Sequence, residues 1–313
     1  MTAFIVRRLL VLPIVLLGVL ALVFMVLHLV PGNPAQVIAG ADAPPETVAA
    51  IEHELGLDRP LPEQFVRYVG RVLQGDLGES LRTRRAVLDD VMDALPNTIQ
   101  LALAAAIITP IVAIPLGVMA AAKRGTPLDG GLMLLSMLGV TAPVFAIALG
   151  LMWVFGYRLR WLPISGDGGA IWTVDGVKSI ILPAVTLAVG AIATMARLTR
   201  SAMLEVLSQD YVRVARAKGL TERVVLLRHG LRNALLPVLT VLGLQVAFLL
   251  SGAVVTETVF AWPGVGRLAV YAIQSRDFPV VQGTVLVIAT MFVLVNLLVD
   301  VLYAVVDPRI HYD

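Results

Sequence analysis

NALLPVLTVLGLQVAFLLSGAVVT, residues 233–256, is the stretch of this sequence that decides the fold. It has 24 residues without a charged side chain, and it lies between Arg232 and Glu257. A helix needs about 20 predominantly apolar residues to cross the hydrocarbon core of a bilayer. The stretch therefore predicts a membrane-spanning helix.

Five further runs of the same kind occur along the chain. They are Leu9–Val30, Ala94–Ala122, Gly130–Tyr157, Ser179–Ala196, which is the shortest, and Phe278–Val299. None of them alternates apolar and polar residues with the period of two that a transmembrane β-barrel requires. We therefore expect an all-α polytopic membrane protein with six transmembrane helices.

The composition also favours a membrane protein. Of the 313 residues, 58% are hydrophobic and 15% are charged, whereas soluble domains have about 45–50% apolar and roughly 25% charged residues. The chain has no cysteine, which excludes a disulfide framework, a thiolate zinc site, an iron–sulfur cluster and a cysteine nucleophile. A formal net charge of +2 gives no indication of nucleic-acid binding.

The first run resembles a cleaved signal peptide in one respect, because Arg7 and Arg8 precede it. However, its apolar run of about 22 residues exceeds the usual 7–15, and the residues that follow it contain no small-x-small cleavage site. We expect a retained helix.

The distribution of Lys and Arg predicts the orientation of the helices, because cytoplasmic loops carry an excess of both. With both termini in the cytoplasm, the inner segments carry thirteen basic residues and the short outer loops carry five, namely Arg158, Arg160, Lys178, Arg267 and Arg276. The inner residues are Arg7, Arg8, Lys123, Arg124, Arg197, Arg200, Arg213, Arg216, Lys218, Arg223, Arg228, Arg232 and Arg309. Trp153, Trp161, Trp172 and Trp262 all fall near the outer helix ends, where amphipathic rings prefer to lie.

Prolines recur within the uncharged runs, at Pro13, Pro110, Pro115, Pro143, Pro183 and Pro237. Two interpretations stay open. The prolines kink the helices and shape a translocation path, or neighbouring helices simply satisfy the backbone groups that each proline frees.

The segment of residues 31–93 is predicted to lie outside the cytoplasm and to be folded. It contains two helical patterns, Pro45–Leu55 with Gly56 as its stop and Pro62–Leu73, then a turn at Gly75–Gly78 and an amphipathic stretch, Ala86–Leu95. Its six Arg and eleven acidic residues give a net charge of −5. The segment is either a docking surface for an external partner or a solvated cap over the helices.

The main cytoplasmic loop, Arg197–Arg232, carries eight of the thirteen inner basic residues. Ser201–Lys218 has helical spacing of its apolar residues, Gly219 is a predicted helix stop, and Thr221 is a predicted cap of a second short helix. A helix–glycine–helix loop with mixed apolar and basic residues suits insertion into a groove on a cytoplasmic partner. The alternative is an amphipathic helix that lies on anionic lipid.

Several kinds of chemistry are missing from the sequence. It contains no G-x-x-x-x-G-K-[ST] loop for nucleotide hydrolysis, and His53-Glu54 does not continue into H-E-x-x-H. The four histidines do not cluster, so metal-ligand spacing is absent. Ion-coupled carriers usually keep charged groups inside their helices, but here Glu257 and Asp300 lie only at the edges of runs. These absences point to a transport subunit whose energy comes from another chain.

The cytoplasmic loop resembles that of the oligopeptide/dipeptide-type permeases of ABC importers. The resemblance rests on DYVRVARAKGL at residues 210–220 and RHGLRNALLP at residues 228–237. It extends over the whole chain through RRLL at 7–10, PGNP at 31–34, GDLG at 75–78, GAVVTETVF at 252–260, PGVG at 263–266, DVLYA at 300–304 and DPR at 307–309. Each motif alone is weak, whereas their order and spacing together are highly specific.

The loop departs from the general importer pattern E-A-A-x3-G-x9-I-x-L-P. Gly219 fits the glycine and Ala215 the second alanine, but Arg213 and Val214 replace the glutamate and the first alanine. The peptide-type subfamily commonly diverges in this way. The acidic contact of the general motif cannot be carried over to Arg213.

The resemblance implies the type I permease fold of ABC importers, with residues 1–30 as the cytoplasmic N-terminus and first helix, 31–93 as the extracytoplasmic segment and 94–313 as the permease core. It implies a coupling loop within residues 197–232. The residues expected to contact an ATPase are Arg213, Ala215, Arg216, Ala217, Lys218, Gly219, Leu220, Thr221, Glu222 and Arg223.

The resemblance also implies partners. They are a second homologous permease, two cytoplasmic ABC ATPases that bind ATP and magnesium, and an extracytoplasmic substrate-binding protein, all at a bacterial or archaeal cytoplasmic membrane. This chain itself would have no catalytic residue, metal or cofactor. Peptides are the expected cargo. A nickel–chelate or glutathione importer is the alternative within the family, and an ion-coupled carrier or membrane enzyme is the alternative from another class.

Overall fold

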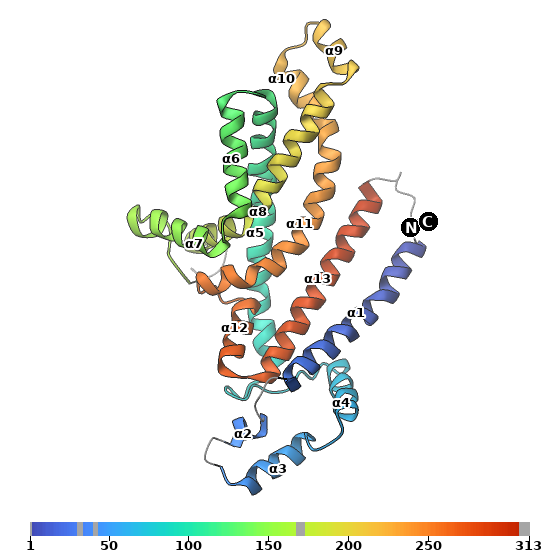
Figure 1. Cartoon of the computed structure of the whole chain (residues 1–313), viewed down its shortest axis with the longest axis vertical. Coiled ribbons are helices and arrows are strands. Elements are labelled where there is room, and N and C mark those ends of the chain that lie inside the picture. The colour runs from blue at the N-terminus through green and yellow to red at the C-terminus, as the bar shows by residue number, and fades with distance from the viewer. Residues whose placement is uncertain (1, 30–33, 40–42, 167–172, 307–313) are drawn as a thin grey trace. The chain divides into compact units, whose positions relative to one another are not determined.

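The computed structural model describes residues 2–29, 34–39, 43–166 and 173–306 (Figure 1). Its regular elements are helices, and the described residues add only an isolated β-bridge between Glu79 and Ala86. The all-α prediction is therefore confirmed for this part of the chain. Trp172 and Arg309, and the motif residues 31–33 and 307–309, lie outside the described residues.

The chain divides into two compact units. The first unit contains α1 (Thr2–Leu29), α2 (Pro34–Ala39), α3 (Pro45–Leu55), α4 (Leu61–Leu73), the start of α5 (Val87–Ala122), α12 (Val265–Ser275) and most of α13 (Phe278–Val306). The second unit contains the rest of α5, α6 (Pro127–Thr141), α7 (Val144–Leu151), the π-helix η1 (Met152–Arg158), α8 (Val174–Leu207), α9 (Asp210–Ala217), α10 (Glu222–Val224), the π-helix η2 (Val225–Leu231), α11 (Arg232–Val259) and the end of α13 from Val295 on.

Four helical segments in the described part of the chain are long and apolar enough to cross a membrane. They are α5, α8, the segment Glu222–Leu250 and the first 22 residues of α13. In α1, the apolar stretch Leu10–Met25 is shorter. The structure thus confirms a polytopic helical protein, while the count of six spans and the orientation stay predictions.

The predicted run Gly130–Tyr157 is not one helix. The structure breaks it into α6 and the pair α7–η1, which are bent by 112°. The break lies at Ala142, whose backbone is extended (φ −69°, ψ 134°), directly before Pro143. Proline disfavours helical conformation in the residue before it and lacks an N–H for the helix ladder. Pro143 therefore breaks this run into two helices, as the kink interpretation of the prolines allows, and whether the bent pair forms one broken span stays a prediction.

The run Ser179–Ala196, expected to be the shortest, lies inside the 34-residue helix α8. This helix continues through Arg197 and Arg200 to Leu207, so the polar loop begins at Ser208. The predicted helix Ser201–Lys218 is accordingly interrupted between α8 and α9. Charged residues ended the apolar run in the sequence, but they do not end a helix.

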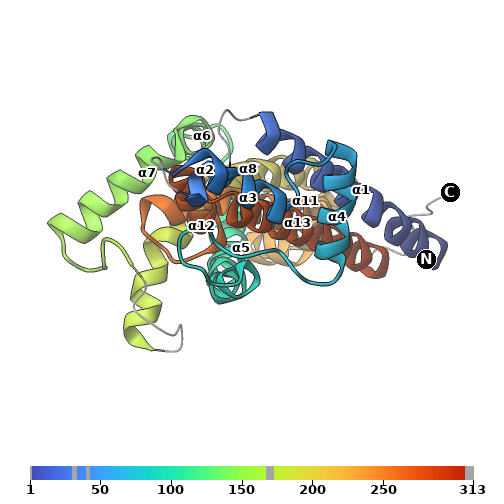
Figure 2. The same ribbon diagram turned by 90° about the horizontal axis from the view of Figure 1, so that it is seen from below.

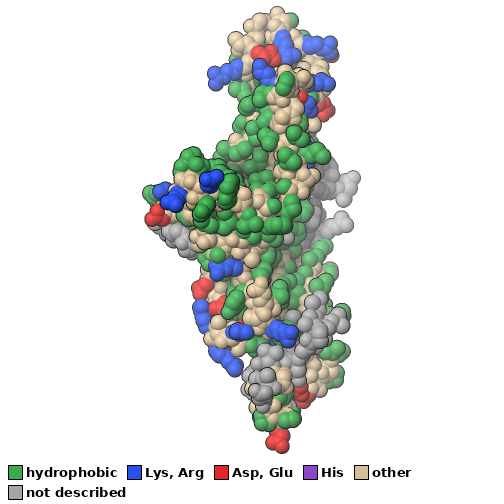
Figure 3. Space-filling view, turned by 60° about the vertical axis from the view of Figure 1, so that its left-hand side comes forward, with side chains coloured by type: hydrophobic (Ala, Val, Ile, Leu, Met, Phe, Trp, Pro, Cys, Tyr) green, Lys and Arg blue, Asp and Glu red, His purple; other side chains and the backbone are tan. Residues whose placement is uncertain are grey.

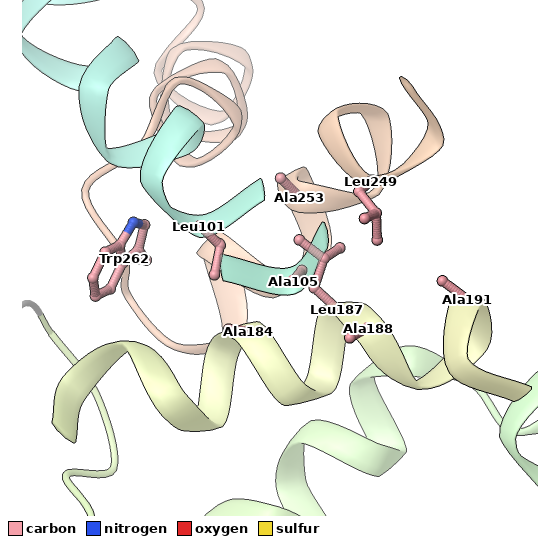
Figure 4. Close-up of a cluster of buried hydrophobic side chains, with 9 residues drawn as sticks. All are labelled: Leu101, Ala105, Ala184, Leu187, Ala188, Ala191, Leu249, Ala253 and Trp262. Atoms are coloured by element: carbon pink, nitrogen blue, oxygen red, sulfur yellow. The ribbon is translucent and has the colours of Figure 1, made fainter. Parts of the chain in front are cut away.

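The core of the second unit is built around α8. Small residues of this helix let α5 and α11 approach closely, as Figure 4 shows for Ala184, Ala188 and Ala191. Leu101 and Ala105 of α5 and Leu249 and Ala253 of α11 complete the cluster with Leu187 and Trp262. Glycines make two further close contacts with α8, because a Cβ at Gly117 or at Gly139 would lie within 3.2 Å of α8 side chains.

Trp262 follows the end of α11, as expected, but its ring does not lie in a lipid interface. It is only 1% exposed, and its indole N–H donates to the carbonyl of Asn97 at 3.0 Å. The amide of Asn97 in turn donates to the carbonyl of Pro263 at 3.0 Å. Trp153 and Trp161 are exposed, while their position at the outer boundary of the membrane stays a prediction.

The segment between the first two predicted spans is folded within the first unit. Pro45–Leu55 and Leu61–Leu73 are helices, and Gly56, Gly75 and Gly78 have positive φ. Helix α4 lies beside α1 (Figures 1 and 2) and buries Tyr68 against Phe24, with ring centroids 6.1 Å apart. The amphipathic stretch Ala86–Leu95 forms the start of α5.

Candidate functional site

The predicted coupling loop folds into α9, α10 and η2. Helix α9 ends in two hydrogen bonds typical of a glycine-terminated helix: the N–H of Gly219 donates to the carbonyl of Arg216 at 2.9 Å, and that of Leu220 donates to the carbonyl of Ala215 at 3.4 Å. Gly219 has φ +80°, which L-residues rarely adopt. The predicted helix stop is therefore confirmed.

Thr221 lies at the N-cap of α10, where the sequence predicts it. Its side chain makes no capping hydrogen bond; instead, its carbonyl accepts from the N–H groups of Val224 and Val225 at 2.9 and 3.1 Å. The position was predicted correctly, whereas the side-chain bond typical of a threonine cap is missing.

A small apolar contact fixes α9 to the rest of the second unit. Val212 and Ala215 pack with Val225 of η2 and Leu207 of α8, and both Val212 and Val225 are completely buried. The hydroxyl of Tyr211 donates to the carbonyl of His229 at 3.1 Å and accepts from the side-chain amide of Asn233 at 2.7 Å. These contacts tie α9 to both sides of η2.

The other face of α9 and the turn into α10 point to solvent. Nine of the ten predicted contact residues are exposed, and only Ala215 is buried, at 6%. Ala215 therefore packs inside the loop and does not form part of its surface. Figure 3 shows the Lys and Arg side chains gathered over α9 and α10, at the top of the view. Tyr211, Val214, Leu220 and Leu227 add exposed apolar area to this basic surface.

Arg216 and Glu222 join α9 to α10 across the turn. The guanidinium donates to both carboxylate oxygens, with Nη2–Oε1 and Nε–Oε2 distances of 2.8 and 3.2 Å. The hydrogen bond from Arg216 lowers the pKa of Glu222, and the carboxylate raises the pKa of Arg216. Both side chains are largely exposed, so the pair contributes about 0–1 kcal/mol, retained above the ordinary pKa of glutamate and lost as the pH falls through the lowered one.

Sequence reasoning missed the residues that hold this surface in place. Tyr211 and Asn233 are 22 positions apart, and their hydrogen bond cannot be inferred from spacing alone. Gly230 is buried, and a Cβ built there would lie 3.0 Å from Cε of Met203, so the close packing of η2 on α8 favours a residue without a side chain. The one available signal was the apolar spacing of Val212 and Ala215 in α9, which places both on one face.

Replacement of Val212 by aspartate is expected to detach α9. An unpaired carboxylate in this fully buried apolar contact costs on the order of several kcal/mol. Limited digestion with trypsin, followed by mass spectrometry, should show faster cleavage after Arg213, Arg216 and Lys218. Val214 lies on the same helix and is 52% exposed, so Val214→Asp is the matched control. Equal cleavage rates in both variants would refute the packing.

Long apolar helices, together with an exposed basic surface on a short polar loop, define a polytopic helical membrane protein. Residues 113–312 match the family described as binding-protein-dependent transport system inner membrane component, and residues 1–102 match the N-terminal part of that family. The chain belongs to this family of transport-system membrane components.

Individual relatives are similar over the complete chain. The dipeptide transport system permease protein of Alkalihalophilus pseudofirmus is 42% identical, with all of both chains covered. The glutathione transport system permease protein of Salmonella paratyphi A is 44% identical, again with all of both chains covered. A crystal structure of an amino acid ABC transporter aligns with 71% of this chain and 94% of its own, at 14% identity and a TM-score of 0.48.

Proposed function

We propose that this chain is the permease subunit of an ATP-driven importer of dipeptides and other short peptides. The full-length identity to a dipeptide transport permease carries this proposal. The chain forms the translocation pathway with a second, homologous permease. Two cytoplasmic ATPases, which hold ATP and magnesium, supply the energy, and an extracytoplasmic binding protein supplies the peptide.

In this proposal the ATPases bind the exposed surface of α9, α10 and η2. The surface combines basic side chains, such as Arg213 and Lys218, with exposed apolar ones, such as Leu220 and Leu227. This mixture suits a groove on a soluble protein, where apolar groups are buried and charges set the orientation.

The excess of basic residues in the predicted inner loops supports six spans with both termini in the cytoplasm of a bacterial or archaeal cell. The segment of residues 31–93 would then face the binding protein. Glutathione is itself a short peptide, and a relative is named for its transport, so glutathione import is the second candidate.

Uptake by the reconstituted complex tests the proposal. Proteoliposomes that contain this chain, its permease partner and the ATPases should accumulate a labelled dipeptide in their lumen. We expect this accumulation only when ATP is enclosed in the lumen, which corresponds to the cytoplasm, and binding protein is added to the external solution. An excess of unlabelled glutathione should leave most of this uptake intact; complete competition would favour the second candidate. Uptake driven by an ion gradient without ATP would contradict the proposed function and favour a carrier.

Docking of the binding protein should depend on the exposed side of α4. Deletion of the whole segment would also remove Tyr68, which packs against α1, so a surface substitution is the sharper test. Val66 is 69% exposed, and Val66→Asp should reduce stimulation of ATP hydrolysis by the binding protein while the ATPases stay attached. Leu135→Asn, at an exposed position of α6 in the second unit, is the control. Undiminished stimulation in Val66→Asp would contradict docking at α4.

A further inference from the structure

A partly buried ion pair, formed by a buried carboxylate and a half-buried guanidinium, fastens the first turn of α6 to α8. Asp129 is 5% exposed, and its two carboxylate oxygens accept from Nε and Nη2 of Arg200 at 2.6 and 2.7 Å. The carboxylate also accepts from the backbone N–H of Gly125 at 3.0 Å. The hydroxyl of Thr126 accepts from the N–H of Asp129 at 3.5 Å, as an N-cap of α6.

This arrangement is rigid for a physical reason. A bidentate pair between a guanidinium and a carboxylate fixes both the distance and the orientation of its partners. Separation of the pair would leave the carboxylate of Asp129, which is almost completely buried, without its charged partner, and this is unfavourable. Ten residues further along α6, Gly139 packs against Val189 and Ala193 of α8. The two contacts hold α6 against α8 over about 15 Å of its length.

The same helix α8 carries the candidate site. Arg200 is seven residues, about two turns, before Leu207, the end of α8. Leu207 packs against the cluster of Val212, Ala215 and Val225. The side chains of Met203 and Leu207 also lie next to Gly230 of η2. A displacement of α9, α10 and η2 therefore acts on the end of α8 through direct packing.

We propose that the Asp129–Arg200 pair is a positioning contact that makes α6 move as one body with α8 when the ATPases displace α9, α10 and η2. This proposal rests on the proposed function. In this proposal the whole of α6 moves with α8, up to Thr141, its last residue before the break at Pro143. The role of the pair in this proposal is to transmit a change between two states of the complex.

Arg200→Gln tests the proposal in the reconstituted complex. We expect at least about fivefold fewer peptides imported per ATP hydrolysed, the lower end of typical allosteric couplings, with the ATPases still attached. Arg200→Lys keeps the charge but loses the bidentate geometry, so its ratio should lie between those of the wild type and Arg200→Gln. Lys123→Gln removes an exposed cation from the neighbouring turn and should leave the ratio unchanged. An unchanged ratio in Arg200→Gln would overturn the proposal.

If the Arg200→Gln variant does not assemble, the distance between spin labels on α6 and α8 tests the proposal instead. The chain has no cysteine, so spin labels on Leu134→Cys and Arg197→Cys, both exposed, report α6 and α8 alone. The distance between the labels in the otherwise unaltered complex should be the same with and without a non-hydrolysable ATP analogue. A shift on addition of the analogue would overturn the proposal. Absence of ATP-driven uptake in the wild type would instead refute the proposed function.

Discussion

Replacement of Gly219 by valine is expected to separate ATP hydrolysis from peptide uptake. Gly219 has φ +80°, and nothing lies within 4 Å of a Cβ built there. The substitution therefore causes no collision, but it places a β-branched residue in the left-handed region, which costs an L-residue roughly 1–2 kcal/mol. We expect the variant to relieve this strain by breaking the two hydrogen bonds that end α9. The position of α10 relative to α9 then changes.

The measurement is the number of peptides imported per ATP in the reconstituted complex, which should fall about tenfold or more, a typical allosteric coupling. Gly75→Val is the matched control, because Gly75 has the same φ of +80° and equally open surroundings but lies in the outer segment. Gly219→Asn should retain most coupling, since asparagine tolerates this conformation. Normal coupling in Gly219→Val, with the ATPases attached, would rule out the turn as a coupling element.

Replacement of Gly117 by leucine is expected to prevent correct folding. A Cβ at Gly117 would lie 2.5 Å from Cβ of Thr199 and 2.7 Å from the backbone carbonyl of Ala196. The backbone of α8 cannot yield as a flexible side chain can, so α5 and α8 would have to separate. Overpacking of this kind typically costs about 1–3 kcal/mol for a few added atoms, and leucine adds four carbons.

Size-exclusion chromatography of the detergent-purified chain should show loss of the monodisperse fraction and a lower midpoint of thermal unfolding. Gly131→Leu, in α6, is the control, because nothing lies within 4 Å of a Cβ at that position. If Gly117→Leu purifies as well as Gly131→Leu, α5 and α8 do not cross at this glycine.

Local features were predictable from the sequence because their causes are local. An uncharged stretch such as 233–256 indicates a membrane helix, and it lies within Glu222–Leu250 and the rest of α11. Gly56 and Gly219 end helices because both positions need positive φ. The helix Pro45–Leu55 follows from its own proline start and glycine stop.

Features that depend on distant neighbours were not predictable. Pro183 and Pro237 lie inside continuous helices, whereas Pro143 marks a break, and their local sequences do not separate the two outcomes. The burial of Trp262 requires the carbonyl of Asn97, 165 residues away. Asp129 and Arg200 are 71 residues apart. Periodicity reports which face of a helix is apolar but not which helix covers that face.

Site-directed cross-linking tests the central claim, that α9, α10 and η2 receive the ATPases. A single cysteine at exposed Thr221, in this chain that has no other, should cross-link to an ATPase subunit through a short bifunctional reagent in the assembled complex. A cysteine at Leu73, which is 81% exposed on α4, should not. A cross-link from Leu73, together with none from Thr221, would contradict the account.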